Sequence, residues 1–298
     1  MLPAMFYELN RLTMMQLAIT GATSGIGAEK AKALSPKCSR VFLLVRNVEK
    51  ARELIQRIDP LDTQKKFTII PCDLTDLSSV ARAAKTLTEA TDKLDLLINN
   101  AGGIFPKKKL TSEGHERTFA ANHLGHFLLT IQLLPLLTNG TGGRVINVSS
   151  DAHKGASVNP QDFELTHGFR SFTAYANAKL YNILFTKSLA EKYADLHLEA
   201  YALHPGVVNT GFGSESKGFF KILLSLFKPF MISPAKGAET GIFLATATNV
   251  PGKNGAYFKK SKPSAVSSKA RSKKLRDQLW DYSMEQVRAY LPAHSASS

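Results

Sequence analysis

The chain has 298 residues, of which 44% are hydrophobic and 21% are charged, a composition typical of a globular protein that buries a sizeable core. Its two cysteines, Cys38 and Cys72, exclude a disulfide framework and favour a reducing compartment, and no stretch reaches the ~20 apolar residues that span a bilayer. The formal net charge of +14 suits a nucleic acid, an anionic membrane or an anionic cofactor.

The two ends of the chain bear on location and partners. The opening "MLPAMFYELNRLTMM" contains Glu8 and does not resemble a signal peptide, so we expect a cytoplasmic protein. Residues 259–276 are rich in Lys, Arg and Ser and contain no acidic residue, which predicts an exposed basic segment. No aromatic residue follows Phe258 in this segment to stack on bases, so we expect no specific nucleic-acid partner.

The hydrophobic pattern alternates short apolar runs with amphipathic segments. The expected strands are residues 16–20, 40–45, 67–72, 94–99, 144–149 and 198–204. The expected helices are residues 25–35, 47–58, 77–91, a segment that follows the fourth strand and ends at Leu137, and residues 173–194. Continuously apolar strands separated by helices predict a parallel sheet that is covered on both faces.

The expected fold is therefore α/β, a Rossmann-type doubly wound parallel sheet of about seven strands flanked by helices on both faces. We expect a single domain over residues 1–298, with a core at about 16–260 and a basic segment and terminal helix (261–290) packed on it. Ligands of such sheets bind beyond the carboxyl ends of the strands, so functional residues are sought there.

The first predicted strand is followed by a glycine-rich turn, "TGATSGIG" (20–27). Glycine permits a tight turn and close approach of a pyrophosphate, while the next helix offers its N-terminal amides and positive dipole end. A turn without a ligand is the alternative. The order strand, turn and helix is the context that the phosphate-binding motif requires, so the sequence predicts phosphate binding here.

The spacing Gly-x-x-x-Gly-x-Gly in this turn resembles the short-chain dehydrogenase/reductase superfamily, and further motifs match that family in order. They are "CDLTD" (72–76), "NNAG" (99–102), "FAANHLGHFLLT" (119–130), "NVSS" (147–150), "YANAK" (175–179) and "HPGVVNT" (204–210). The matches span about residues 16–260. The segment "NHLGHFLLT", the Pro-Gly motif and the ending "GAYF…KKLRDQLWDYS" are most similar to the retinol-dehydrogenase-like branch.

Tyr175 and Lys179 lie four residues apart, so a helix places them on one face. Alone, the pair favours an ordinary helix surface, but the resemblance implies a catalytic set of Asn122, Ser150, Tyr175 and Lys179. A phenol has a pKa of about 10 and is a poor base at neutral pH. A neighbouring ammonium and an oxidised nicotinamide are expected to lower the pKa of Tyr175, which then exchanges a proton with the substrate oxygen.

The resemblance also implies the roles of the other three residues. Ser150 hydrogen-bonds the carbonyl oxygen as charge develops, Lys179 holds the cofactor ribose, and Asn122 orders a water for proton relay. The neighbouring Ser149 is equally available in the sequence; Ser150 is chosen because the second serine of this motif is the catalytic one in the family. Residues 151–174 separate Ser150 from Tyr175 by more than in many members and are expected to form a loop beside the substrate.

The cofactor is expected to contact residues at the ends of several strands. Asp73 would meet the adenine, Thr210 the carboxamide, and His204 would shape the turn near the nicotinamide. The expected cofactor-binding residues are Gly21, Thr23, Ser24, Gly25, Ile26, Gly27, Arg46, Asn47, Asp73, Leu74, Asn100, Ala101, Gly102, Tyr175, Lys179, Pro205, Gly206, Val208 and Thr210.

The end of the second strand bears on which nicotinamide is used. An acidic residue there would bind the ribose 2′-hydroxyl of NAD, but Val45 stands at that position. Arg46 follows and suits a 2′-phosphate, although an arginine that stacks on adenine is compatible with NAD. NADP(H) is therefore favoured, with NAD(H) as the open alternative, and carbonyl reduction is the expected direction in a cell with a reduced NADPH pool.

The segment "GFFKILLSLFKPFMIS" (218–233) lies where the family has its substrate lid. It is interpreted as an apolar lid over a lipophilic substrate, with a shallow peripheral membrane contact and a core or oligomer contact as alternatives.

His123 and His126 stand three apart, and no Cys, Asp or Glu cluster joins them in the sequence, so they are expected to be structural and no metal site is expected.

These features predict an NADP(H)-dependent oxidoreductase that interconverts a lipophilic alcohol and carbonyl of the retinoid, steroid or fatty-aldehyde type. A non-catalytic NADP(H)-binding sensor or scaffold on the same fold is the alternative, but it would be expected to lack some of the four catalytic residues. A basic membrane- or nucleic-acid-associated protein is suggested only by the charge. The family resemblance implies a homodimer or homotetramer.

Overall fold

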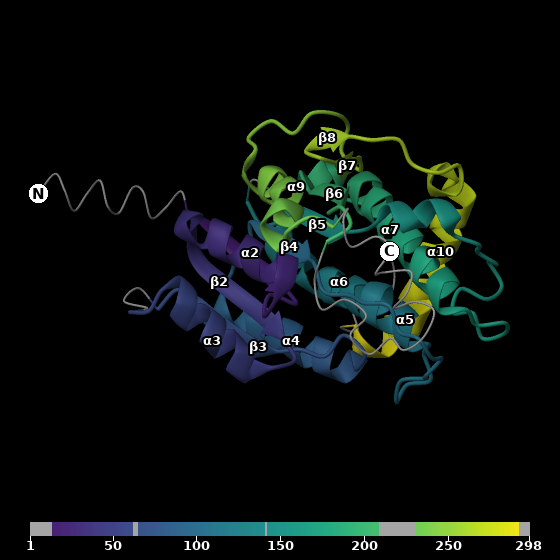
Figure 1. Cartoon of the computed structure of the whole chain (residues 1–298), viewed down its shortest axis with the longest axis horizontal. Helices are drawn as coiled ribbons and strands as arrows, with labels where there is room; N and C mark the ends of the chain where they lie inside the picture. The colour runs from purple at the N-terminus through teal and green to yellow at the C-terminus, as the bar shows by residue number, and fades with distance from the viewer. Residues whose placement is uncertain (1–13, 62–64, 141, 209–230, 292–298) are drawn as a thin grey trace, which may run out of the picture.

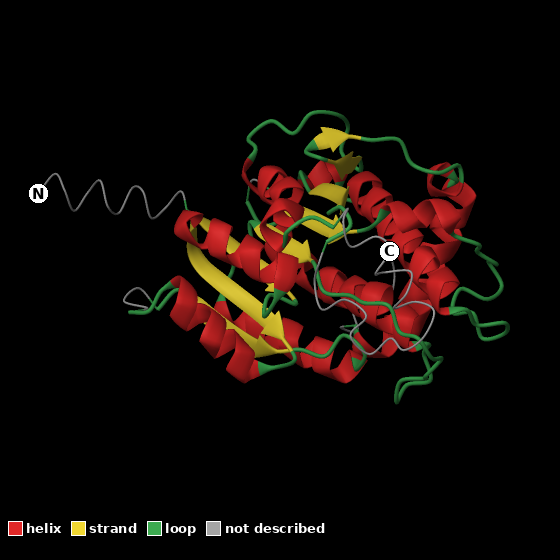
Figure 2. Cartoon of the chain, in the orientation of Figure 1, coloured by secondary structure: helices red, strands yellow, loops and turns green. Residues whose placement is uncertain are grey.

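The computed structural model describes residues 14–61, 65–140, 142–208 and 231–291. In this part of the chain an eight-stranded sheet has the order β3-β2-β1-β4-β5-β6-β7-β8, and all neighbouring strands are parallel except β7 and β8 (Figures 1 and 2). The strands are β1 (Met15–Thr20), β2 (Cys38–Val45), β3 (Phe67–Pro71), β4 (Leu96–Asn99), β5 (Arg144–Val148), β6 (Glu199–His204), β7 (Tyr257–Lys259) and β8 (Lys262–Pro263). The predicted doubly wound sheet is confirmed, with one strand more than the seven expected.

Helices cover both faces of this sheet. They are α2 (Gly25–Leu34), α3 (Val48–Ile58), α4 (Leu77–Ala90), α5 (Arg117–Phe119), α6 (Gly125–Leu137), α7 (Ser171–Lys192), α9 (Pro234–Thr246) and α10 (Lys273–Val287). Successive side chains of a strand point to opposite faces, so Leu17 and Ile19 pack in one core cluster with residues of α2, α3 and α9, whereas Ala18 packs in the other with α4, α6, α7 and α10. Burial on both faces explains why the strands read as continuously apolar.

The segment after β4 differs most from its expected structure. The helix that ends at Leu137 begins only at Arg117, because residues 100–116 form a loop that includes Gly102 at φ +157°. Between α5 and α6, residues Ala120–Leu124 form a π-helical turn. Single π-turns inside helices are uncommon and concentrate at functional sites. This one contains Asn122.

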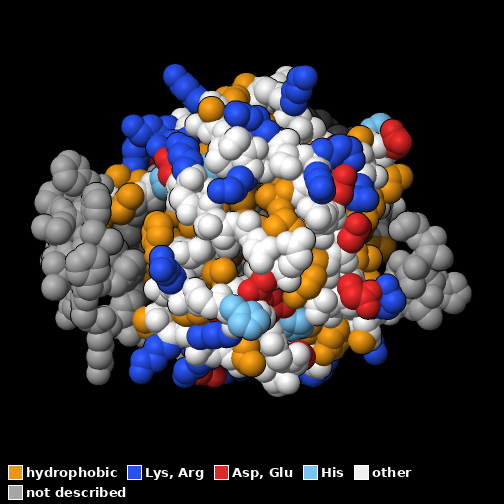
Figure 3. Space-filling model, turned by 90° about the vertical axis from the view of Figure 1, so that its right-hand side faces the viewer, with side chains coloured by type: hydrophobic (Ala, Val, Ile, Leu, Met, Phe, Trp, Pro, Cys, Tyr) orange, Lys and Arg blue, Asp and Glu red, His pale blue; other side chains and the backbone are white. Residues whose placement is uncertain are grey.

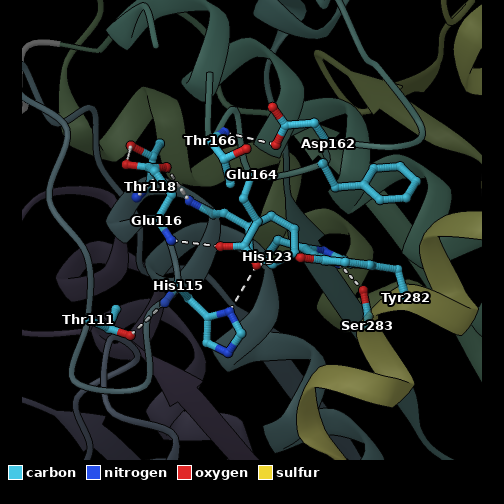
Figure 4. Close-up of polar contacts among 12 residues, drawn as sticks. Thr111, His115, Glu116, Thr118, His123, Asp162, Glu164, Thr166, Tyr282 and Ser283 are labelled. Atoms are coloured by element: carbon cyan, nitrogen blue, oxygen red, sulfur yellow. Dashed lines mark hydrogen bonds and ion pairs between the residues drawn. The ribbon is translucent and has the colours of Figure 1, made fainter. Parts of the chain in front are cut away.

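The C-terminal helix is tied to two distant loops by a buried polar cluster. Glu164 accepts hydrogen bonds from Tyr282 of α10 (2.6 Å) and from the backbone N of Glu116 (2.7 Å), and it contacts His115 Nδ1 at 2.9 Å (Figure 4). His123 lies beside this cluster and contacts Ser283 of α10 at 2.9 Å. The cluster therefore joins the loop before α5, the loop between Ser150 and Tyr175, and helix α10.

Most basic side chains of the segment 259–276 are exposed, as expected, although Ala270 and Leu275 within it are buried. Ala270 is fully buried, Lys269 donates to the carbonyl of Ala156 (2.8 Å), and Arg276 pairs with Glu191 (2.7 Å). Of these contacts, the Arg276–Glu191 ion pair offsets part of the local positive charge. On the face of the molecule shown in Figure 3, Lys and Arg side chains are interspersed with acidic, polar and apolar ones.

Trp280 anchors α10 to the body of the protein. Its ring lies against Phe127 (centroids 5.1 Å apart) and Phe185 (6.2 Å), and Lys192 Nζ lies 5.0 Å from it. We expect Trp280→Ala to lower the free energy of unfolding by about 3–5 kcal/mol, since removal of a buried aromatic leaves a cavity. Urea denaturation followed by circular dichroism measures this change. Phe172→Ala, at a ring that is 51% exposed, is the control and should cost roughly 0.5 kcal/mol; equal losses would contradict the packing role.

None of the helices among the described residues has the length and apolar character needed to cross a membrane. Residues 218–230, the greater part of the expected lid, lie outside the described residues, as does Thr210.

Candidate active site

The glycine-rich turn between β1 and α2 leaves no room for side chains at two of its glycines. Gly21 has φ +64°, and a Cβ there would lie 2.8 Å from the Cβ of Ala101. A Cβ at Gly27 would overlap the carbonyl oxygen of Gly21 and lie 2.6 Å from Asn100 Nδ2. This bare backbone at the N-terminus of α2 is the cradle that a pyrophosphate requires, so the residues fit a dinucleotide.

The "NNAG" segment after β4 holds this turn in place. Asn100 Nδ2 donates to the carbonyls of Thr20 (3.0 Å) and Gly21 (3.3 Å), and the backbone N of both Asn100 and Ala101 donates to Thr20 Oγ1. Three predicted cofactor-binding positions, Asn100, Ala101 and Gly102, thus lie directly beside the predicted phosphate loop. The topology explains this, since β1 and β4 are neighbouring strands.

The remaining predicted cofactor positions lie along the same edge of the sheet. Arg46 and Asn47 are exposed after β2, and Asn47 caps α3 by accepting from Lys50 N (2.9 Å). After β3, Asp73 Oδ1 accepts from the backbone and hydroxyl of Thr75, which fixes the turn. Thr23, Ser24, Gly25 and Ile26 complete the first turn, and Leu74, Pro205, Gly206 and Val208 follow other strands.

The two serines after β5 have different environments. Ser149 is 1% exposed and its hydroxyl donates to the backbone carbonyl of Lys179 (2.7 Å). Ser150 is partly exposed, accepts from Ala152 N (3.2 Å) and is hydrogen-bonded to Tyr175. The structure therefore brings Ser150, and not Ser149, to the phenol, as the sequence predicts.

Lys179 and Asn122 meet around Gly102. A Cβ at Gly102 would lie 2.5 Å from Asn122 Oδ1 and 3.2 Å from Lys179 Nζ, so glycine is needed for this approach. Lys179 donates to the carbonyl of Val148 (3.1 Å), and its Nζ lies 5.5 Å from the centre of the Tyr175 ring. The predicted quartet thus lies together, although Tyr175 stands one turn inside α7 instead of at its start.

Asn122 is held rigidly. Its Nδ2 donates to the carbonyls of Gly103 (2.9 Å) and Thr118 (2.9 Å), and its Oδ1 accepts from Gly103 N (3.1 Å). Both amide hydrogens are therefore used, and one lone pair of Oδ1 remains for a further donor such as water.

The predicted lowering of the Tyr175 pKa, which invokes a bound oxidised nicotinamide, stays a prediction, and in the protein without cofactor the pKa shifts in the opposite direction. Burial raises the pKa of Tyr175 to about 12, and the hydrogen bond with Ser150 opposes this only in part. Burial also lowers the pKa of Lys179 to about 8, so its ammonium is itself poorly solvated. Desolvation of the phenolate is the larger effect here. At neutral pH the phenol of Tyr175 consequently keeps its proton.

Sequence reasoning missed Asp151, which follows Ser150 directly. Its carboxylate accepts from Tyr257 (3.1 Å) and pairs with Lys259, both in β7, and its backbone N donates to His204 Nδ1 (3.3 Å). Hydrogen bonds from Lys259 and Tyr257 and the charge of His204 hold the pKa of Asp151 at about 2 despite burial. This network connects the end of β5 to those of β6 and β7. No spacing rule pointed to this network, because His204, Tyr257 and Lys259 lie more than 50 residues from Asp151.

His123 and His126 lie in the core and their contacts are internal. Thr20 Oγ1, which accepts from two backbone amides, is 2.9 Å from His126 Nε2, and His126 Nδ1 is 3.3 Å from the carbonyl of Asn122. Burial lowers the pKa of both histidines to about 3, so they are neutral. His126 therefore links the phosphate loop to the π-turn. Within the described ranges no group of three or more metal-binding side chains occurs.

Comparison with known proteins agrees with this geometry. The family model for short chain dehydrogenase matches residues 16–218, so the chain belongs to the short-chain dehydrogenase family. Within that family it is retinol-dehydrogenase-like. It is 37% identical to retinol dehydrogenase 12 of Mus musculus over 90% of this chain and 85% of that protein. It is 33% identical to retinol dehydrogenase 11 of Homo sapiens over 90% of this chain and 84% of that protein.

Solved structures show the same fold. An uncharacterized protein from Mycobacterium paratuberculosis superimposes with a TM-score of 0.75 at 29% identity, covering 93% of this chain and 94% of that one. The NADPH-bound carbonyl reductase from chicken fatty liver has a TM-score of 0.64 at 23% identity, covering 85% of this chain and 99% of that one. The predicted family is confirmed: the chain is an oxidoreductase that acts on the CH–OH/carbonyl couple and uses a nicotinamide cofactor.

Proposed function

We propose that the protein is an NADP(H)-dependent reductase of lipophilic carbonyl compounds that uses Tyr175 as its proton donor. The observation that carries the proposal is the convergence of Ser150, Tyr175, Lys179 and Asn122 beside a glycine cradle at one edge of the sheet. The bound nicotinamide supplies or accepts the hydride.

Proton transfer follows from the states of Tyr175 and Lys179. With its pKa raised to about 12, Tyr175 is protonated throughout the neutral range and can donate to a substrate oxygen. Below its pKa of about 8, Lys179 is charged and stabilises the phenolate that remains. This state favours reduction, because oxidation requires the phenolate at the outset.

Ser150 and Asn122 position the reacting groups. Ser150 lies within hydrogen-bonding reach of Tyr175, so a carbonyl oxygen placed between them would accept from both hydroxyls as negative charge develops. The free lone pair of Asn122 Oδ1 suits a water that returns a proton towards Lys179. The side chains of Asn122 and Lys179 are close to each other, because both lie beside Gly102.

Support for the substrate class comes from relatives and from the sequence. Retinol dehydrogenases 11 and 12 carry a lipophilic substrate in their names, and the apolar segment 218–233 suits a lid over such a molecule or a shallow contact with a membrane surface. The test follows NADPH absorbance with retinal, steroid ketones and long-chain aldehydes. Turnover of at least one class is expected. Binding of NADPH without turnover of any would favour the non-catalytic alternative.

Arg46 supports the preference for NADP(H), since its side chain is exposed at the end of β2 and the residue directly before it, Val45, is not acidic. A hydrogen bond to a charged group contributes about 1.5–3 kcal/mol, so Arg46→Ala should raise the Kd for NADPH roughly tenfold to hundredfold and leave that for NADH nearly unchanged. Arg57→Ala, in the last turn of α3, is the matched control. Fluorescence titration of both cofactors measures the effect; equal weakening of NADPH and NADH would contradict it.

A further inference from the structure

Lys30 is a fully buried cation below the glycine-rich turn. It lies in α2 and is 0% exposed, whereas lysines are almost never fully buried unless paired. Its Nζ donates to Asn100 Oδ1 at 3.1 Å. Gly241 of α9 faces it, and a Cβ there would lie 2.5 Å from Lys30 Cε. The fold thus holds a dedicated space for this ammonium.

The position of Lys30 connects it to the phosphate loop through one residue. Asn100, which accepts from Lys30, donates from its Nδ2 to the carbonyls of Thr20 and Gly21. A Cβ at Gly27 would lie 2.6 Å from this same Nδ2. Lys30 therefore supports the amide that holds the backbone on which a pyrophosphate would rest.

The surroundings supply Lys30 with no counter-charge. It forms no ion pair with any described residue, and the charged group whose field acts on it is another cation, Lys179 of α7. On α9, Lys236 and Glu239 are exposed and pair with each other (2.8 Å). Strands β1 and β4 contain no charged residue. On α2 itself, Glu29 is partly exposed and Lys32 is exposed.

An isolated buried ammonium is costly, and the protein relieves this cost by losing the proton. Burial, and secondly the charge of Lys179, lower the pKa of Lys30 to about 7. An anion bound at the turn above it would supply the missing counter-charge and favour the protonated form.

We propose that Lys30 is a positioning residue of the cofactor site and that binding of the dinucleotide pyrophosphate at the glycine-rich turn takes up a proton from solvent at Lys30. This inference rests on the proposed nicotinamide-dependent function. Because the complex binds more protons than the free protein, affinity is highest at low pH and falls as pH rises above about 7. Each unit by which the bound anion raises the pKa of Lys30 weakens binding at high pH by about tenfold.

The test is calorimetric titration of the full chain with NADPH between pH 7 and 9, in two buffers that differ in ionisation enthalpy. Above pH 7 the 2′-phosphate, with a pKa of about 6, stays ionised and adds little proton exchange of its own. We expect uptake of a fraction of a proton at a pH of about 7.5, and a Kd that rises across the range.

Two substitutions separate charge from position. Lys30→Met removes both the ammonium and its hydrogen bond, whereas Lys30→Gln keeps a donor for Asn100 Oδ1 but cannot titrate. Both should lose the proton uptake seen in the wild-type protein, and Lys30→Gln should bind better than Lys30→Met at pH 9. Lys32→Met, an equal loss of charge on the exposed face of α2, is the control and should retain the uptake.

The experiment distinguishes failure of the inference about Lys30 from failure of the proposed function. Equal proton uptake and equal Kd in the wild-type protein and Lys30→Gln would overturn this inference while nicotinamide binding stands. Uptake that remains in both Lys30 variants and peaks near pH 8 would assign the proton to Lys179 instead. Failure of the wild-type protein to bind NADPH or NADH at any pH would overturn the inference and the proposed function together.

Discussion

Replacing Tyr175 with phenylalanine is expected to lower kcat for carbonyl reduction by about a thousandfold, within the range of roughly 10²–10⁴ that a positioned proton donor contributes. The ring and its packing remain, so the Kd for NADPH should stay within about twofold of wild type. The loss arises because the hydroxyl of Ser150, which is hydrogen-bonded to Tyr175, belongs to an alcohol, and an alcohol is a far weaker acid than a phenol. Initial rates with saturating NADPH measure it.

A matched control is available on the same helix. Tyr193 is the C-cap residue of α7, at the opposite end from Tyr175, so Tyr193→Phe removes a hydroxyl without touching the catalytic quartet. Its kcat should equal that of the wild-type protein. Full activity of Tyr175→Phe would show that another group donates the proton and would remove Tyr175 from the mechanism.

Gly27→Ala is expected to raise the Kd for NADPH by about a hundredfold or more, equivalent to roughly 2.7 kcal/mol of binding free energy. A Cβ at this position overlaps the carbonyl of Gly21 and approaches Asn100 Nδ2 to 2.6 Å, so the loop must move away from the phosphates. The same overlap should cost about 1–3 kcal/mol of stability. Fluorescence titration and thermal denaturation with and without NADPH measure the two effects separately.

Gly155→Ala serves as the control for this substitution. A Cβ at Gly155 would meet the Phe172 ring at 3.7 Å, an ordinary van der Waals contact, so neither cofactor affinity nor stability should change measurably. Wild-type affinity in Gly27→Ala would mean that the dinucleotide does not rest on this turn.

The sequence predicts the sheet well because its signals are local. Residues 17–19 of β1, 41–45 of β2 and 96–98 of β4 form continuous apolar runs, and the helices that follow β2 and β3 have a clear helical periodicity. The β7–β8 hairpin was not predicted. Its turn has Lys260 (φ +50°) and Ser261 (φ +58°) in place of the glycine or asparagine that marks such turns in a sequence.

The residues of the candidate site were predicted from motifs, but the pKa values of its groups could not be predicted from the sequence. The sequence places Lys179 beside Tyr175, but whether the cation or burial controls the phenol depends on solvation that only the packed structure determines. Asp151 and its partners in β7 meet only through the sheet order. Lys30 did leave a signal, since it interrupts the apolar face formed by Gly27, Ala31 and Leu34.

The most direct test of the central claim is the transfer of label from NADPH that carries deuterium at both C4 positions of the nicotinamide to a lipophilic carbonyl. Incubation of the purified protein with the labelled cofactor and retinal, a steroid ketone or a long-chain aldehyde is followed by mass spectrometry of the alcohol. The account predicts one deuterium at the carbinol carbon of the product, and about a thousandfold less labelled alcohol in the same time when Tyr175→Phe replaces the wild-type protein. Tight binding of NADPH without label in any alcohol would contradict it and identify the site as a cofactor sensor.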